Sequence, residues 1–289
     1  MAGIWWLASY PKSGNTWLRA VLATLLSGRS ADINAMPLVS LLANNRAVFD
    51  NALGIESADL TIEQETNLRP RVYEMLAAEA ERPLFCKAHD VYRRTPAGEP
   101  LFPTAATLGA VYIVRDPRAV AVSYANHRAE AVERTIARME DQEGARSASI
   151  ERLPLHLRLR IGPWRDHVES WLGAPFPVHL VRYEDMHSDP HAAFAAVAAF
   201  LGLPFDRARI AAAVEATAFP RLQGQEHATG FVEKPIRATA FFREGRIDGW
   251  RQVLTAEQAT RIVAAHGAVM KRCNYDTHLM PLIAEHGAA

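Results

Sequence analysis

Residues 4–25 read IWWLASYPKSGNTWLRAVLATL and decide the predicted fold, because an apolar run, a tight turn and an amphipathic pattern follow one another directly. The run Ile4–Tyr10 has the apolar character of a buried strand. From Trp17 to Leu25, apolar residues recur at spacings of three and four, which marks one face of a helix. Gly28 then supplies a helix stop. The chain therefore begins with a predicted strand, turn and helix.

The turn carries groups that suit an anion. A helix that begins near Asn15 leaves backbone N–H groups without intrahelical partners, and its dipole favours negative charge at that end. Lys12 adds a positive charge, while Ser13, Asn15 and Thr16 add hydrogen-bonding side chains around Gly14. The lysine precedes the glycine, so this is not the nucleotide-binding pattern G-x-x-x-x-G-K-[ST]. Taken alone, the turn is better explained as a solvated lysine beside a capping serine.

Three later apolar runs predict further strands, at 84–88, 108–114 and 178–183. Strands this apolar are typical of a parallel sheet buried on both faces. Asp-Pro pairs at 116–117 and 189–190 predict helix starts after the third and fourth strands, and a last helix is expected around 262–270. The expected fold class is α/β, with a central, mostly parallel sheet flanked by helices.

Polar residues stand where these strands end, which is the edge at which such sheets bind ligands. The chain brings to this edge Lys12, His89, Arg115, Glu184 and Asp185. Taken singly, Arg115 could form an ion pair with Asp116 or Asp185, and His89 could be a structural histidine held by Asp90. Together with the turn, these residues favour one anion-binding site.

Composition limits the function classes. The 289 residues contain 32 basic and 32 acidic side chains, so no overall field draws the chain to nucleic acid or to an anionic membrane. Only Cys86 and Cys273 are present, which argues against a disulfide framework and fits a reducing compartment. No stretch approaches the roughly 20 apolar residues of a membrane span, and no basic leader precedes the first strand. A cytoplasmic location is expected.

We expect a single domain over residues 1–289. Within it, 29–80 is interpreted as a helical insertion, with Pro70 punctuating short helices. Residues 221–242 lack clear periodicity and are predicted to form a mobile lid over an acceptor. A variable stretch at about 130–165 could form another wall of that acceptor site.

Six segments, in order, resemble the motifs of sulfotransferases that use 3′-phosphoadenosine 5′-phosphosulfate (PAPS). YPKSGNTW at 10–17 resembles their 5′-phosphosulfate loop, and VYIVRDPRAVAVSY at 111–124 resembles their 3′-phosphate motif. The others are FCKAHD at 85–90, VRYEDM at 181–186, TAF at 217–219 and FFREGRIDGW at 241–250. The resemblance spans residue 4 to about 255 and implies the sulfotransferase type of P-loop-like α/β architecture. The segment WLASYPKSGNTWLRA at 6–20 is most similar to bacterial natural-product enzymes, such as those that modify glycopeptides.

The resemblance also implies roles for individual residues. His89 would be the general base, Lys12 would stabilise the leaving phosphate oxygen, and Lys87 would face the sulfuryl oxygens. PAPS would be the co-substrate and 3′-phosphoadenosine 5′-phosphate (PAP) the product, with in-line transfer and no metal. The implied nucleotide-binding residues are Lys12, Ser13, Gly14, Asn15, Thr16, Trp17, Arg115, Ser123, Tyr183, Thr217, Phe219, Arg243, Glu244 and Gly245.

Two departures from the family pattern affect these expectations. Glu244 stands where the family usually has lysine, and DGW at 248–250 replaces GDW, which predicts a weaker grip on the 3′-phosphate. The family's dimer signal is poorly matched at 251–260, so a monomer or a weak homodimer is expected. The acceptor would be a hydroxylated small molecule or a peptide scaffold. A P-loop kinase and a PAPS-binding protein without turnover are the alternatives.

Overall fold

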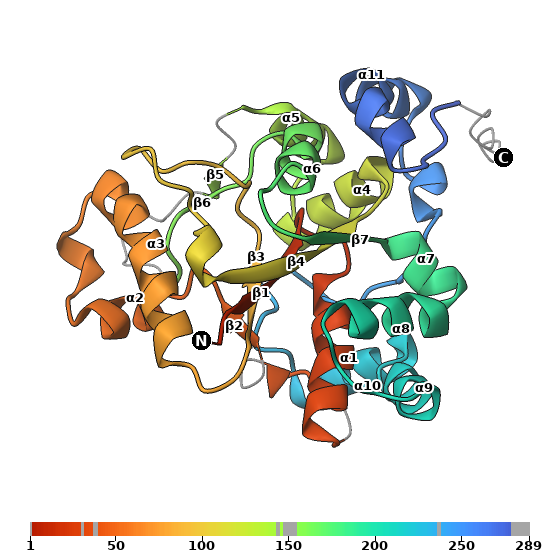
Figure 1. Cartoon of the computed structure of the whole chain (residues 1–289). Helices are drawn as coiled ribbons and strands as arrows, with labels where there is room; N and C mark the ends of the chain where they lie inside the picture. The colour runs from red at the N-terminus through yellow and green to blue at the C-terminus, as the bar shows by residue number, and fades with distance from the viewer. Residues whose placement is uncertain are drawn as a thin grey trace, which may run out of the picture.

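The computed structural model of the chain describes residues 2–29, 32–36, 40–142, 145–146, 155–235 and 238–278. Five strands form a sheet in the order β2-β3-β1-β4-β7, and every neighbouring pair in it is parallel (Figure 1). These strands are β1 (Ile4–Ser9), β2 (Ser40–Leu42), β3 (Leu84–Ala88), β4 (Thr107–Val114) and β7 (Val178–Arg182). A short antiparallel pair joins β5 (Ala145–Arg146) to β6 (Leu159–Arg160). The predicted α/β class and parallel sheet are confirmed.

Helices connect the strands and cover both faces of the sheet. The α-helices are α1 (Asn15–Ser27), α2 (Arg46–Leu53), α3 (Ile62–Glu79), α4 (Pro117–Arg128), α5 (Val132–Glu140), α6 (Trp164–Leu172), α7 (Tyr183–Ser188), α8 (Pro190–Phe200), α9 (Arg207–Ala216), α10 (Phe219–Thr229) and α11 (Ala256–Arg272). The short 3₁₀ helices are η2 (Ser57–Asp59), η3 (Thr104–Ala106) and η4 (Gly249–Gln252). Among the helices described, none is long and apolar enough to cross a membrane.

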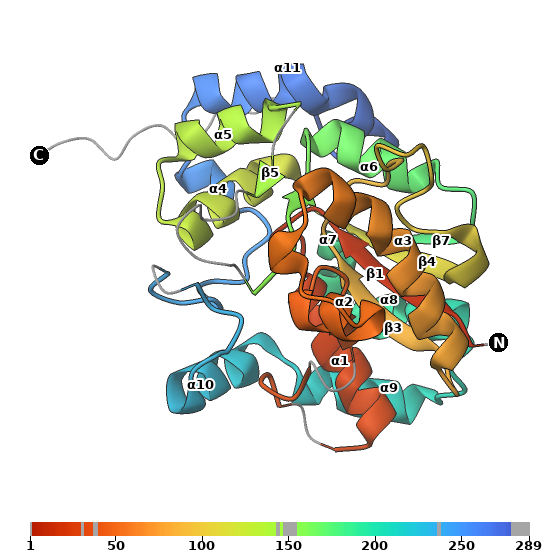
Figure 2. The same cartoon turned by 90° about the vertical axis from the view of Figure 1, so that its left-hand side faces the viewer.

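The sheet lies between two layers of helices, because successive side chains of each strand point to opposite faces and pack into different apolar clusters. On β1, Leu7 packs into a cluster with α1, α8 and α9, while Trp6 and Ala8 pack into a second cluster with α3, α4, α6 and α11. On β4, Val111 belongs to the first cluster and Tyr112 to the second. Because successive strand side chains point to opposite faces, both faces are apolar and both need a helical cover. Figure 2 shows α4, α6 and α11 above the sheet and α1 and α9 below it.

The predicted helix signals hold. Gly28 ends α1 with a left-handed φ of 65°. The Asp116 side chain accepts a hydrogen bond from the Arg118 N–H at the start of α4, and Asp189 does the same for Ala192 in α8. These caps fix the points at which the chain turns from the strand ends into helices.

The interpretation of 29–80 as a helical insertion needs correction in two respects. Residues Ser40–Leu42 form β2, which pairs with β3 and becomes an edge strand of the sheet. Three residues are too few for an alternating pattern to be read. Pro70 does not separate two helices either, because it lies inside the 18-residue α3.

The predicted lid at 221–242 also contains regular structure that the sequence did not reveal. Its first half belongs to α10, with Leu222 and Glu226 buried. The Glu226 carboxylate accepts hydrogen bonds from the backbone N–H groups of Phe241 and Phe242. These bonds attach the end of the predicted lid to α10. A polar helix of this kind has no apolar stripe to detect.

Candidate active site

One large cavity lies at the carboxyl ends of the strands, with a volume of about 1230 Å³. This exceeds the roughly 300–1,000 Å³ of a usual small-molecule pocket and leaves room for two ligands. Of the predicted site residues, only Ser13 is absent from its walls, since Ser13 is fully buried within the loop. The wall residues are Lys12, Gly14, Asn15, Thr16, Trp17, Lys87, His89, Arg115, Ser123, Tyr183, Thr217, Phe219, Arg243, Glu244 and Gly245. The sheet thus gathers them into one site.

The loop between β1 and α1 is held in a tight left-handed turn. Lys12 has a φ of 69° and Gly14 a φ of 105°. A Cβ atom at Gly14 would lie 2.5 Å from the ring of Tyr183, so only glycine fits. Successive backbone N–H groups in such a turn form a concavity for anions. The Asn15 amide donates to the Leu7 carbonyl at 2.8 Å, which ties this concavity to the end of β1.

Of the buried donors that have no protein partner in the part of the chain that the structure describes, two lie in the loop or on the arginine that contacts it. They are the Ser13 hydroxyl and the Nε atom of Arg115. Buried polar groups are normally hydrogen-bonded, so each such atom calls for a ligand group. Both are donors, and both therefore fit an anionic ligand such as a nucleotide phosphate.

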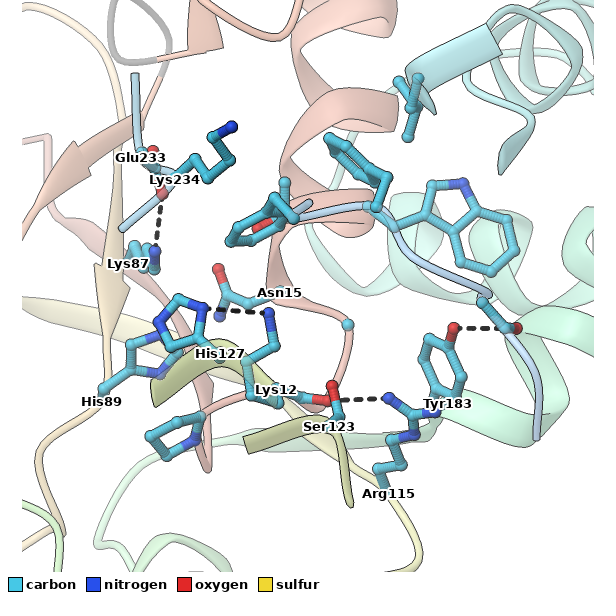
Figure 3. A pocket seen from close by; sticks show the side chains of 18 of the residues that line it. Lys12, Asn15, Lys87, His89, Arg115, Ser123, His127, Tyr183, Glu233 and Lys234 are labelled. Carbon is cyan, nitrogen blue, oxygen red and sulfur yellow. Dashed lines mark hydrogen bonds and ion pairs between the residues drawn. The ribbon is translucent and has the colours of Figure 1, made fainter. Parts of the chain in front are cut away.

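Arg115 connects the loop to residues 241–250, which are called the late segment below. Its Nη1 donates to the Lys12 carbonyl at 3.0 Å, and its Nη2 donates to the Arg246 carbonyl at 2.9 Å. The guanidinium lies 4.2 Å from the ring centre of Tyr183. Ser123, on α4, lies beside it in Figure 3. Arg115 does not pair with Asp116 or Asp185 as the alternative required.

His89 follows β3 and is fixed by the backbone of the neighbouring strand. Its Nδ1 lies 2.8 Å from the Ser9 carbonyl oxygen, and 3.4 Å from the Ser9 hydroxyl. A carbonyl oxygen can only accept, so Nδ1 carries the proton in the neutral ring. Nε2 is then the unprotonated nitrogen of the ring, and a general base needs such a nitrogen to accept a proton.

The alternative in which Asp90 holds His89 does not fit the geometry. The Asp90 carboxylate instead accepts from the buried Arg69 guanidinium at 2.6 Å and from the Arg160 N–H at 3.0 Å. Both side chains of the Asp90–Arg69 pair are 1% exposed. Glu184, another polar residue at a strand end, is also structural, because it accepts from the Asp116 N–H and the Tyr275 hydroxyl.

Lys12 extends from the loop toward α4 and the late segment. Its Nζ lies 3.5 Å from Nδ1 of His127 and 3.9 Å above the ring centre of Phe241 (Figure 3). The lysine therefore occupies the middle of the cavity, between the loop and the side that carries His89. His127 is not among the predicted site residues, but its place four residues after Ser123 puts it on the same face of α4.

Lys87 forms an ion pair that sequence analysis also missed. Its Nζ lies 2.8 Å from Glu233, and the second carboxylate oxygen of Glu233 lies 2.6 Å from Arg19 of α1. Burial would raise the pKa of Glu233, but the Lys87 and Arg19 charges and their hydrogen bonds outweigh it and lower that pKa to about 2. Nothing in the sequence signals Glu233, because it lies in an aperiodic segment.

Aromatic side chains form the wall farther along the cavity. Trp17 contacts Phe194 and His187 at centroid distances of 5.4 and 5.3 Å, so it is both a core residue and a wall residue. The Tyr183 hydroxyl donates to the Gly245 carbonyl at 3.3 Å. Gly245 has a φ of 65° and would clash with Phe219 if it carried a Cβ. This close contact brings the late segment onto the aromatic wall.

Two of the predicted nucleotide contacts are already engaged within the protein. The Thr217 hydroxyl donates to the Ala213 carbonyl at 2.8 Å, so toward a ligand it can only accept. Arg243 pairs with Glu244 at 2.9 Å, with both side chains more than 40% exposed. An exposed pair of this kind is weak and can rearrange for a phosphate.

Fold and site define a class of protein. A parallel α/β sheet that places an anion-binding loop, a remote arginine, an oriented histidine and aromatic walls around one cavity is built for a nucleotide and a second ligand. Residues 4–274 match the sulfotransferase domain family. The chain belongs to that family, and the enzyme class predicted from sequence, a PAPS-dependent sulfotransferase, is confirmed.

Known proteins are similar to this chain at low identity. Flavonol 3-sulfotransferase from Flaveria bidentis is 24% identical over 286 residues, covering 92% of this chain and 83% of that protein. Sulfotransferase 1A1 from Rattus norvegicus is 22% identical, covering 93% and 85%. Among solved structures, retinol dehydratase with androsterone and PAP has a TM-score of 0.61 at 20% identity, covering 96% of this chain and 82% of that one.

Proposed function

We propose that this enzyme transfers the sulfuryl group of PAPS to a hydroxyl of a small-molecule or natural-product acceptor, with His89 as the general base. The observation that carries the proposal is the 2.8 Å contact from Nδ1 of His89 to the Ser9 carbonyl, which assigns the proton of the neutral ring to Nδ1 and makes Nε2 the basic nitrogen. The acceptor hydroxyl would lose its proton to this atom as its oxygen attacks sulfur. The S–O bond to the leaving phosphate then breaks.

The remaining charged residues suit the rest of this chemistry. The loop and Lys12 would stabilise the phosphate oxygen that leaves, since positioned donors matter most where negative charge grows. Arg115 and Ser123, two turns apart on the other side of the loop, would bind the 3′-phosphate. The mechanism as proposed uses no metal, because cationic side chains supply the positive charge at the reacting group.

A hydroxylated apolar acceptor suits the other end of the cavity. Leu42, which pairs with Lys87 in the β2–β3 ladder, and Phe241, whose ring centre lies 3.9 Å from the Lys12 Nζ, are among the apolar residues of the cavity wall. The names of the relatives support this class, since they include flavonol sulfotransferases and a structure that holds retinol and PAP. The preference for bacterial natural products, the lid at 221–242, the cytoplasmic location and the monomeric or weakly dimeric state stay predictions.

Two measurements test the function against its alternatives. Calorimetry should show PAP binding more tightly than ATP or ADP, whereas a P-loop kinase would prefer ATP with magnesium. Transfer of labelled sulfate from PAPS to a panel of phenols, steroids and hydroxylated peptides should give a product in the presence of a metal chelator. Binding of PAP without transfer to any acceptor would favour the non-catalytic alternative.

His89→Ala provides the matched variant for this test. Loss of a general base of this type costs roughly 10²–10⁴-fold in turnover, while nucleotide binding does not depend on it. We therefore expect PAP affinity within a few-fold of the parent protein together with near-complete loss of transfer. Turnover at the parent rate would contradict the assignment of the base.

A further inference from the structure

Glu233 places a negative charge beside the part of the cavity that, under the proposed function, binds the negatively charged sulfuryl group. In Figure 3 its carboxylate meets Lys87, which lies on the same side of the cavity as His89. Both Glu233 oxygens are used, one by Lys87 at 2.8 Å and the other by Arg19 at 2.6 Å. The Arg19 side chain is fully buried and the Glu233 side chain is 14% exposed. This is an organised cluster rather than a surface ion pair.

The cluster carries a net charge of +1, from two cations and one carboxylate. Under the proposed function, Lys87 faces the sulfuryl oxygens of PAPS, which carry one negative charge. Lys87 has three N–H donors in a tetrahedral arrangement, so an oxygen bound to a second donor would lie roughly 5 Å from the Glu233 carboxylate. Glu233 is therefore near enough to repel the group that Lys87 attracts.

We propose that Glu233 is a specificity-determining residue of the sulfuryl subsite, which weakens the binding of PAPS relative to PAP. PAP lacks the sulfuryl group and does not reach Lys87, so its affinity is insensitive to Glu233. This inference rests on the proposed function and goes beyond it, because it assigns a residue outside the family motifs to discrimination between donor and product.

The expected size follows from the geometry. Between two unit charges about 5 Å apart, at an effective dielectric constant between those of protein and water, repulsion changes a dissociation constant about tenfold. The pKa of about 2 means that Glu233 stays ionised across any practical assay range, so the effect does not fade between neutral and mildly acidic pH. The proline that follows at 235 and the contact of the Val232 N–H with Asn34 hold the residue in place.

The test compares dissociation constants for PAP and PAPS in the full chain. Glu233→Gln should raise the preference for PAPS over PAP by about tenfold, with PAP affinity changed less than about twofold. The KM for PAPS should fall without a rise in kcat, as expected when binding strengthens in the ground state and transition state alike. Glu215→Gln is the control, because Glu215 also lines the cavity but is exposed and pairs with Arg221. It should leave the preference unchanged.

A second variant keeps the proposal testable if Glu233→Gln does not fold. Glu233→Gln leaves Arg19 buried without a counter-ion, which is destabilising. The double variant Arg19→Met with Glu233→Gln removes both charges and keeps Lys87. It should show a smaller rise in the preference, because the loss of the Arg19 charge, on the far oxygen of Glu233 from Lys87, offsets part of the gain. An unchanged ratio in either folded variant overturns the role of Glu233 alone. Failure of the parent protein to bind PAP or PAPS would instead overturn the donor assignment and this inference with it.

Discussion

Replacing Arg115 with glutamine tests whether this arginine selects a 3′-phosphorylated nucleotide. The guanidinium has five N–H groups, of which the Lys12 and Arg246 carbonyls use one each. Three remain, including the buried Nε that has no partner among the residues described. Two of them can bind one phosphate side by side.

The magnitude follows from those two bonds. Charge-assisted hydrogen bonds contribute about 1.5–3 kcal/mol each, so removing two of them costs at least about 3 kcal/mol. That corresponds to about 10²-fold in affinity for PAP. AMP lacks the 3′-phosphate, so its affinity should fall only through loosening of the loop.

Calorimetric titration of PAP and AMP against both proteins is the assay. The ratio of the two dissociation constants isolates the 3′-phosphate, because structural damage weakens both ligands together. Arg182→Gln is the control, since Arg182 loses the same charge next to Tyr183 but does not line the cavity. A PAP-to-AMP preference that survives in Arg115→Gln would refute the reasoning.

Three further predictions concern the loop, the reaction and the core. Gly14→Ala forces a methyl group to 2.5 Å from Tyr183 at a φ of 105°, and should lower Tm by roughly 5 °C, whereas Gly224→Ala, which meets no atom within 4 Å, should not. Lys12→Met should lower kcat roughly 10²–10³-fold with a much smaller change in PAP affinity, measured by sulfate transfer and calorimetry. Burial lowers the pKa of His167 to about 4, so the unfolded chain takes up a proton near pH 6.5 before the folded one does. Unfolding free energy should therefore fall by about 2 kcal/mol between pH 7.5 and 5 through this residue, and urea melts of His167→Gln should show that much less dependence on pH.

The sequence predicted the central sheet well, because its strands are buried on both faces and are apolar throughout. The run at 84–88 is β3 as observed, and the first, third and fourth predicted strands differ from β1, β4 and β7 by one residue at one end. Strand β2 escaped notice because it is short and lies at the edge. Helix α10 escaped because its buried residues include a glutamate that binds backbone N–H groups.

The site was predictable where a residue follows a strand directly. His89 and Arg115 are in that position, so the strand order alone brings them together. Glu233 and His127 could not be found in this way, because they reach the cavity from an aperiodic segment and from within a helix, and Arg19 is a buried helix residue that contacts Glu233. Their meeting depends on tertiary contacts between parts of the chain up to 214 residues apart.

The bond from His89 to Ser9 has a consequence for how this enzyme can vary. The acceptor is a main-chain oxygen, and the two residues directly follow Ala8 and Ala88, which are partners in the β1–β3 ladder. The tautomer of the histidine is thus fixed by the pairing of two strands and not by a second side chain. A substitution at position 9 leaves that oxygen in place, so it should not by itself change the tautomer of the proposed general base.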